Sequence, residues 1–141
     1  MHLHELRALW AKSGVSIRRG AAEAQISALV SLAPYEVPRA VLNYFEFIDG
    51  MEEGDMGPEL IRFWTIDEVM TSKTVDGDSV CFDIADVSIL ADMITLRVTE
   101  RGARVVCRWE PKTDRVIAET FEEFIDLYVA DPESVVRRMN S

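Results

Sequence analysis

The chain has 141 residues, of which 48% are hydrophobic and 9% aromatic, enough for one domain with a single core. This composition excludes disordered, collagen-like and disulfide-dense proteins. The formal net charge is −10, from 15 Lys and Arg against 25 Asp and Glu. Nucleic acids and anionic membranes are disfavoured as partners, because both need a cationic surface.

The negative charge is concentrated in one stretch of the sequence. Between Glu46 and Asp92 there are thirteen acidic residues and only two basic ones, Arg62 and Lys73, which gives a local net charge of −11. A partner attracted to this stretch would itself be basic, and its association would be fast and sensitive to salt. The alternative is that the acidic residues serve only to keep the protein soluble.

Helical periodicity dominates the first fifty residues. The segments 2–12 and 22–32 place apolar side chains three and four residues apart, which predicts two amphipathic helices. A third helix is predicted from Pro38 to a C-terminal stop at Gly50. We therefore expect this half to form a layer of helices.

A change of pattern follows the helical half. The segment 51–59, MEEGDMGPE, mixes glycine, proline and acids and is predicted to be an exposed loop. The residues 60–64, LIRFW, favour a strand. Thr65 and Glu68 then match a capping box, which predicts a short helical segment.

The remainder of the chain is predicted to be a sheet closed by a helix. Four strand-like runs lie at 79–84, 93–98, 103–109 and 115–118. Their short connections favour an antiparallel meander. A second capping box at Thr120 begins a helix, and Asp131 caps a final turn. The order of elements indicates an α+β domain: an antiparallel sheet of about four to six strands, with N-terminal helices and a C-terminal helix packed around it.

Most aromatic residues fall on the predicted inward faces. Six are expected in the core: Trp10, Phe45, Phe63, Phe82, Phe121 and Phe124. Trp64 and Trp109 each lie next to a strand residue whose side chain points to the opposite face of the sheet. We therefore expect both tryptophans to be half exposed. Either tryptophan would suit the anchor of a protein interface.

The sequence lacks the residue patterns of common active sites. The two histidines, His2 and His4, are two residues apart and so point to different helix faces, which does not suit a metal pair. Asp76-Gly77-Asp78 is too short for a calcium-binding loop, and the glycines match no nucleotide-binding fingerprint. We predict no catalytic residues, no metal and no cofactor. The alternative is an enzyme whose site has no sequence signature.

Two cysteines and the N-terminal segment bear on the compartment. Cys81 and Cys107 lie in apolar runs and are expected to be reduced core thiols, whereas a redox pair would need them to face each other on neighbouring strands. The first ten residues, MHLHELRALW, contain an acid and no long apolar run, so we expect no signal peptide. No stretch approaches the 18 apolar residues of a membrane span. These features predict a cytoplasmic protein.

Four segments, in order, match a known family. They are a helix led by Gly20 with Ile26 and Leu29, VPRAVLNYFEFIDG at 37–50, FWTIDEV at 63–69 followed by FDIADVSILADMITLRV at 82–98, and IAETFEEFIDLYVADPESV at 117–135. On these motifs the chain resembles the SUKH superfamily, in the branch named for the yeast cell-wall-assembly regulator. It departs from the family pattern in its short 33–36 loop and in Val87, where the family commonly has an aromatic residue.

The resemblance implies a single α+β domain without a catalytic signature. Bacterial members of the superfamily are associated with immunity to polymorphic toxins, often nucleases or deaminases, which they inhibit by direct binding. The yeast relative is a signalling and scaffold protein. The resemblance therefore implies a non-catalytic immunity protein with a toxin domain as its partner, and the acidic charge of the chain predicts that this domain is basic. The alternative is an intracellular scaffold module without a toxin partner.

The acidic stretch supplies the residues that we expect to bind this partner. They are Glu52, Glu53, Asp55, Glu59, Asp76, Asp78, Asp83 and Asp86, together with Trp64. On one shared face these carboxylates would imitate the phosphates that a basic nuclease cleft holds, and inhibition would be steric. Met51 and Met56 are expected to add exposed, adaptable apolar contacts. The alternative is that the acids of the 79–84 strand simply face solvent.

Overall fold

The computed structural model describes residues 1–110 and 113–140, without the side chains of 109, 110 and 113. The side chain of Trp109 therefore lies outside the described part. The helices are α1 (Leu3–Lys12), α2 (Glu23–Leu32), α3 (Arg39–Phe47), α4 (Ile66–Thr71), α5 (Phe121–Ala130) and α6 (Pro132–Asn140), with a 3₁₀ turn, η1 (Pro58–Leu60). The strands are β1 (Ile61–Phe63), β2 (Thr74–Asp76), β3 (Ser79–Val87), β4 (Asp92–Thr99), β5 (Gly102–Glu110) and β6 (Thr113–Ala118).

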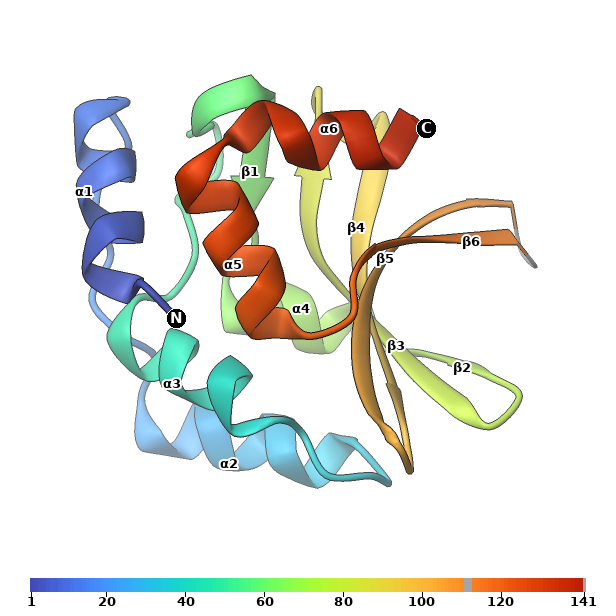
Figure 1. Cartoon of the computed structure of the whole chain (residues 1–141). Coiled ribbons are helices and arrows are strands. Elements are labelled where there is room, and N and C mark those ends of the chain that lie inside the picture. The colour runs from blue at the N-terminus through green and yellow to red at the C-terminus, as the bar shows by residue number, and fades with distance from the viewer. Residues whose placement is uncertain (111–112, 141) are drawn as a thin grey trace.

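The strands form one antiparallel sheet, which confirms the predicted α+β class. Its order is β1-β3-β4-β5-β6, and β2 also pairs with β3. The predicted meander corresponds to β3 through β6. Both short strands lie on the same edge of β3, β2 against residues 79–81 and β1 against residues 85–87. The long strand β3 therefore connects two separate ends of the sheet (Figure 1).

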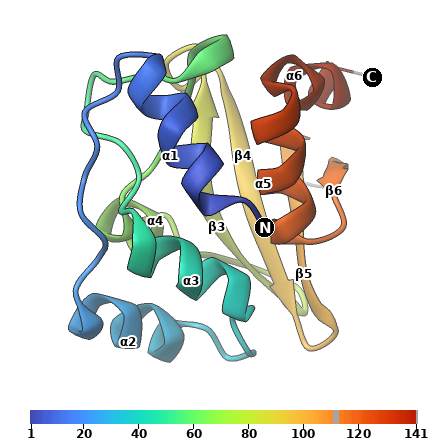
Figure 2. The same ribbon diagram turned by 60° about the vertical axis from the view of Figure 1, so that its left-hand side comes forward.

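The helices cover one face of the sheet. Figures 1 and 2 show α1 and α5 side by side over that face, with α3 and α2 below them and α6 crossing near the end of α5. The final turn predicted after Asp131 is in fact the nine-residue helix α6, which buries Val135 and Met139. Pro132 is well suited to this helix start, because its fixed φ suits a first helical residue.

An aromatic cluster joins β1 to the helices. The Phe63 ring centroid lies 5.0 Å from that of Trp10 in α1, and 4.8 Å and 5.7 Å from those of Tyr128 and Phe124 in α5. The Trp10 indole Nε1 donates a hydrogen bond of 3.1 Å to the Tyr128 hydroxyl. The six aromatic residues predicted to be core are each at most 2% exposed. These contacts connect the two ends of the chain to the short strand β1.

Gly20 is required by a close approach of two backbones. An ideal Cβ at this position would lie 1.9 Å from the carbonyl oxygen of Glu46. The next residue, Ala21, donates its backbone N–H to the carbonyl of Phe45 at 2.8 Å. The glycine that leads the first matched motif thus lets the segment before α2 pair with the end of α3.

Both cysteines are buried and free, as predicted for core thiols. Cys81 in β3 faces Arg97 across the ladder, and Cys107 in β5 faces Ile94, so β4 lies between the two thiols. They are not on neighbouring strands that would form a redox pair. Within the described residues, no helix has the length and apolar character needed to span a membrane.

Candidate functional site

The structure divides the predicted binding residues between two ends of β3. Asp76 and Asp78 flank the turn between β2 and β3, whereas Asp86 is near the other end of β3, beside β1. At the usual rise of a strand, Ser79 and Asp86 are about 23 Å apart. The predicted acidic residues therefore do not share one continuous face.

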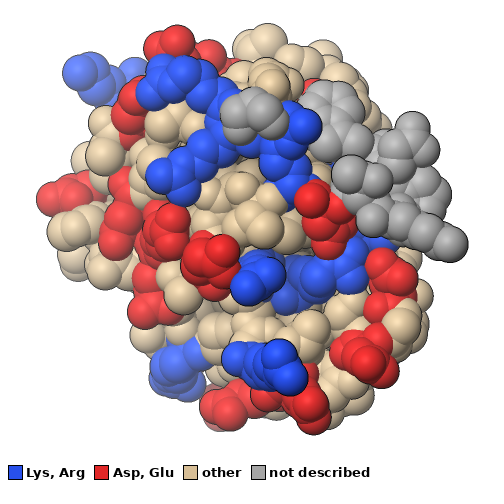
Figure 3. Space-filling view, turned by 45° about the vertical axis from the view of Figure 1, so that its right-hand side comes forward, with Lys and Arg blue, Asp and Glu red and all other residues tan. Residues whose placement is uncertain are grey.

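At the β2 end, the acidic charge is paired with arginines. Asp76 lies 3.1 Å from Arg97 and 3.2 Å from Arg108, and both arginines also contact Asp114. The side of the molecule that carries β2 and β6 shows acidic and basic side chains close together (Figure 3). These arginines come from β4 and β5, outside the acidic stretch of the sequence. Asp76 is therefore not a free carboxylate for a basic partner.

Three further predicted residues lie outside any common site. Asp83 is half buried and accepts a hydrogen bond of 2.8 Å from the Thr95 hydroxyl. Asp78 is exposed in the β2–β3 turn, and Glu59 is exposed in η1. Neither Asp78 nor Glu59 lines a hollow together with the residues beside β1.

At the β1 end, the structure forms a hollow of about 530 Å³. Four predicted residues line it, namely Glu53, Asp55, Trp64 and Asp86. The rest of the lining is Gly54, Met56, Arg62, Glu68, Ile89 and Leu90. Segments far apart in the sequence thus converge here: the loop before η1, β1, the start of α4 and the β3–β4 turn.

The acidic loop at this hollow is held in place by other residues. Arg18 donates from Nη1 to the carboxylate of Glu52 and from Nε to the carbonyl of Asp49, both at 2.8 Å. The backbone N–H of Ser16 donates to the carboxylate of Asp55 at 3.0 Å. Glu52 is therefore a residue that fixes the loop, and of the loop acids only Glu53 and Asp55 line the hollow.

Met51 contradicts the prediction of an exposed methionine. It is fully buried, whereas Met56 is half buried. The reason is local: the backbone N–H of Met51 donates to the carbonyl of Phe63 at 2.9 Å, which extends the pairing of β1 and directs the start of the loop inward. Only Met56 remains available to the hollow.

Arg62 is occupied by internal contacts. Its guanidinium donates to both carboxylate oxygens of Glu68, at 2.7 Å and 3.1 Å, and to the carbonyls of Met51 and Glu52. Burial alone would raise the pKa of Glu68, but hydrogen bonds from Arg62 and Thr65 outweigh it, so the pKa is lowered. Thr65 and Glu68 form the predicted capping box at the start of α4.

Asp86 and Trp64 form the inner wall of the hollow. The Trp64 indole Nε1 donates to Asp86 Oδ2 at 2.6 Å, and the backbone N–H of Leu90 donates to Oδ1 at 3.2 Å. Asp86 is only 4% exposed. Arg62 lies opposite Asp86 in the β1–β3 register, yet its guanidinium bonds to Glu68 instead. Among the described residues, no cationic group forms an ion pair with Asp86.

The β3–β4 turn is a part of the site that the sequence did not reveal. Ser88, Ile89 and Leu90 have φ values of +54°, +57° and +63°, a left-handed conformation that costs about 1–2 kcal/mol for each such residue. The Ile89 side chain is 74% exposed and that of Leu90 is 62% exposed. Leu60 is also left-handed, and its carbonyl accepts the Ser88 N–H at 3.0 Å. Strain of this kind gathers at functional sites.

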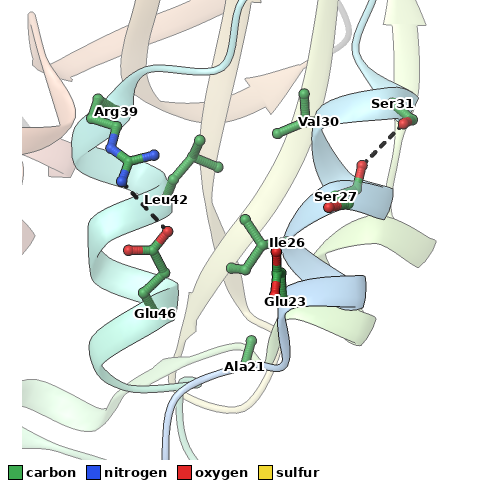
Figure 4. Close-up of a pocket in the computed structure, with 9 residues that line it drawn as sticks. All are labelled: Ala21, Glu23, Ile26, Ser27, Val30, Ser31, Arg39, Leu42 and Glu46. Carbon is green, nitrogen blue, oxygen red and sulfur yellow. Dashed lines mark hydrogen bonds and ion pairs between the residues drawn. The ribbon is translucent and has the colours of Figure 1, made fainter.

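A second hollow, of about 670 Å³, lies between α2 and α3 (Figure 4). Ile26, Val30 and Leu42 give it an apolar lining, and Arg39 and Glu46 on its α3 wall pair with each other at 3.7 Å. None of the predicted binding residues lines it. The hollow beside β1 is therefore the better candidate site.

The described groups show little that would support covalent or metal chemistry. Burial raises the pKa of Cys81, and it raises the pKa of Cys107 to about 11, so both thiols are protonated at neutral pH. In the described ranges, 1–110 and 113–140, no group of three or more His, Cys, Asp or Glu side chains could hold a metal ion. The arrangement beside β1 is suited to binding a cationic, partly apolar group.

Comparisons with known proteins do not assign the chain to a family. No protein-family model matches it, and no curated protein matches it with statistical significance. The resemblance to the SUKH superfamily therefore stays a prediction from the four motifs.

Proposed function

We propose that this protein is a non-catalytic binding protein that takes a basic protein partner at the hollow beside β1. The observation that carries the proposal is the buried carboxylate of Asp86, without an ion-pair partner among the described residues, beside the exposed Ile89 and Leu90. Following the resemblance to SUKH proteins, the partner is a cognate toxin domain and the protein is its immunity protein.

The charge of the lining supports a cationic partner. Of the charged residues that line the hollow, Arg62 and Glu68 neutralise each other. Glu53, Asp55 and Asp86 leave a residual charge of three negatives. Complementary charge of this kind increases the association rate and sets the orientation of docking.

The apolar part of the lining supports a protein as the partner. Trp64 is half buried, and Met56, Ile89 and Leu90 surround the same hollow. Tryptophan and aliphatic anchors beside charged groups are typical of the energetic centres of protein interfaces. Inhibition would be steric, because the bound protein would cover the basic cleft of the toxin. No chemistry on a substrate is needed.

The proposal includes a cytoplasmic location. Two buried, free cysteines suit a reducing compartment, where thiols persist. The scaffold alternative is favoured by one observation, the separate α2–α3 hollow, because a scaffold presents more than one docking face. A toxin gene adjacent to the gene of this protein would favour the immunity role.

The test begins with the identification of the partner. Affinity capture from the native host, followed by mass spectrometry, identifies bound proteins, and the purified partner is assayed for toxicity with and without this protein. Association rates are then measured at several salt concentrations for Glu53→Lys and Asp78→Lys. Both residues are exposed and both substitutions make the same charge change, but only Glu53 lines the hollow.

We expect Glu53→Lys to slow association about tenfold at low salt and to weaken its salt dependence, while Asp78→Lys has a much smaller effect. Equal effects of the two variants would mean that only net charge matters and would refute the hollow as the docking site. A captured partner whose activity is unaffected by this protein would refute the immunity role.

A further inference from the structure

We propose that the hollow beside β1 recognises one arginine side chain of the partner, with the guanidinium bound to Asp86 and stacked on the Trp64 indole. This inference rests on the proposed function and adds to it the chemical group that is read. Four features of the hollow support it: a buried carboxylate without an ion-pair partner among the described residues, free acceptor positions on Asp86, an aromatic and aliphatic lining, and an adjoining hollow that shares Trp64.

The first feature is a buried negative charge that gains from a cationic ligand. Asp86 is only 4% exposed and lines the hollow. The nearest arginine in the register, Arg62, is directed to Glu68 and to two backbone carbonyls. An approaching cation would therefore meet no competing cationic group at Asp86 among the described residues.

The second feature is the geometry of the carboxylate. Each oxygen of Asp86 accepts one hydrogen bond, from the Trp64 indole or from the backbone of Leu90. A carboxylate has about four acceptor positions, so both oxygens retain room for another donor. The guanidinium of arginine presents two parallel N–H groups that match two carboxylate oxygens. The ammonium of lysine is a single, strongly hydrated point charge and lacks this match.

The third feature is the apolar lining around the charge. The indole of Trp64 provides a face for a planar cation, which it attracts through its ring quadrupole. Ile89 and Leu90 are 74% and 62% exposed and lie on the rim. The aliphatic stem of an arginine would cover part of this apolar surface while its head reaches Asp86.

The fourth feature is an adjoining hollow that also has Trp64 in its lining. This adjoining hollow has a volume of about 500 Å³. It shares Trp64 and Glu68 with the hollow beside β1 and extends along α4 to Ser72. An extended segment of the partner could therefore place its arginine in the hollow beside β1 while a neighbouring residue occupies the adjoining hollow. This arrangement favours an arginine within an exposed loop or strand of the partner over a free small molecule.

The experiment uses three capped tripeptides, acetyl-Leu-Xaa-Leu-amide, with arginine, lysine or citrulline at the central position. Citrulline keeps the shape of arginine but carries no charge. Binding is followed by the NMR resonance of the Trp64 indole N–H, assigned with Trp64→Phe. We expect a saturable shift with the arginine peptide, weaker binding of the lysine peptide and no saturable shift with the citrulline peptide.

Variants of the protein test the assigned carboxylate. Asp86→Asn is expected to weaken arginine binding at least about tenfold, because a charge-assisted hydrogen bond is lost. Asp83→Asn is the matched control, since Asp83 is on the same strand but bonds to Thr95 outside the hollow. If Asp86→Asn does not fold, Glu53→Gln provides the test: Glu53 is exposed in the same lining, and a smaller loss of affinity is expected.

Equal binding of the arginine and citrulline peptides, or the absence of any saturable shift, would overturn the inference. The proposed function fails separately. If the purified partner still binds at the hollow, as judged by slow association with Glu53→Lys, while the arginine peptide does not bind, only the arginine inference falls. If the partner also binds without any effect of Glu53→Lys, both fall.

Discussion

Glu68 shows how a single carboxylate can stabilise the wall of the proposed site. It receives two hydrogen bonds from Arg62 and accepts the backbone N–H of Thr65 at 3.1 Å. These bonds favour its charged form over the protonated one, so its pKa is lower in the folded protein than in the unfolded chain. The stability that it contributes is therefore present above its ordinary pKa of 4.5 and is lost as the pH falls through the folded value.

We predict that Glu68→Gln makes the stability of the protein less dependent on pH in acid. The free energy of unfolding, measured with urea from pH 7 down to pH 3, should differ most between the wild type and Glu68→Gln at pH 7, and the difference should shrink below about pH 4.5. Glu36→Gln, at an exposed position, is the control and should follow the wild type. A constant difference across the range would contradict the prediction.

Some residues were predictable from the sequence because their roles are local. Thr65 and Glu68 form a capping box within four residues, and the spacing alone identifies it. Asp86 is different, since its role depends on Trp64, which is 22 residues away and becomes a neighbour only through the β1–β3 pairing. Asp86 and Trp64 were both predicted from the sequence to be binding residues, but the sequence could not indicate that they bond to each other.

At the scale of elements, the β3–β4 turn is the most unusual part of the fold. Three successive left-handed residues keep Ile89 and Leu90 exposed beside the hollow. The Ala91 N–H donates to the carbonyl of Val87 at 3.1 Å and closes the turn. This run contains no glycine or asparagine, so it carries no turn signal, which is why β3 is longer than predicted.

We predict that Ile89→Gly stabilises the protein by about 0.5–1 kcal/mol. Glycine relieves the left-handed strain of about 1–2 kcal/mol, and its greater freedom in the unfolded chain offsets only part of this gain. The same substitution should weaken binding of the partner, because it removes an exposed apolar contact. Urea denaturation measures the first effect and association with the partner the second.

Ala91→Gly is the matched control for this turn. Ala91 is exposed in the same connection but is not among the left-handed residues. Its replacement should destabilise the protein by about 0.5–1 kcal/mol, since glycine adds freedom to the unfolded chain without relieving strain. A loss of stability with Ile89→Gly of the same size as with Ala91→Gly would show that the turn is not strained.

The bounds of an element could be predicted only where its pattern is visible in the sequence. The helices α1, α2 and α3 begin and end within about two residues of their predicted bounds, because apolar spacing and Gly or Pro stops mark them. The strand β2 was not predicted, because a three-residue strand is too short for alternation to show. It forms because the turn at Gly77, with a φ of +59°, folds it back on β3.

At the scale of the whole molecule, sheet pairing redistributes the charge. The stretch from Glu46 to Asp92 is strongly acidic in sequence, but β4 and β5 bring Arg97 and Arg108 against Asp76. The sequence could not show this, because which strands pair, and in which register, is decided by contacts between distant residues. Of the acidic residues predicted to bind a partner, only Glu53, Asp55 and Asp86 converge beside β1, in a much smaller area than the sequence suggested.

The Trp10–Tyr128 hydrogen bond connects helices from opposite ends of the chain, and both side chains are fully buried. We predict that Tyr128→Phe destabilises the protein by about 1–3 kcal/mol, because it leaves the buried indole N–H without its acceptor. Tyr35→Phe, at a half-buried tyrosine, should change stability little. Urea denaturation followed by tryptophan fluorescence measures the free energy of unfolding of both variants. Equally small losses of stability in the two variants would mean that the Trp10–Tyr128 hydrogen bond does not contribute to stability.

The same bond has a consequence for biosynthesis. Trp10 leaves the ribosome before its acceptor, which is 118 residues further along the chain. At ordinary elongation rates, α1 must wait about 6–24 s before α5 exists to cover it. During that interval the aromatic surface of Trp10 in the nascent chain is not yet covered by α5. The domain is thus expected to close only after α5 has been made, and chaperones that bind nascent chains would have time to act on it.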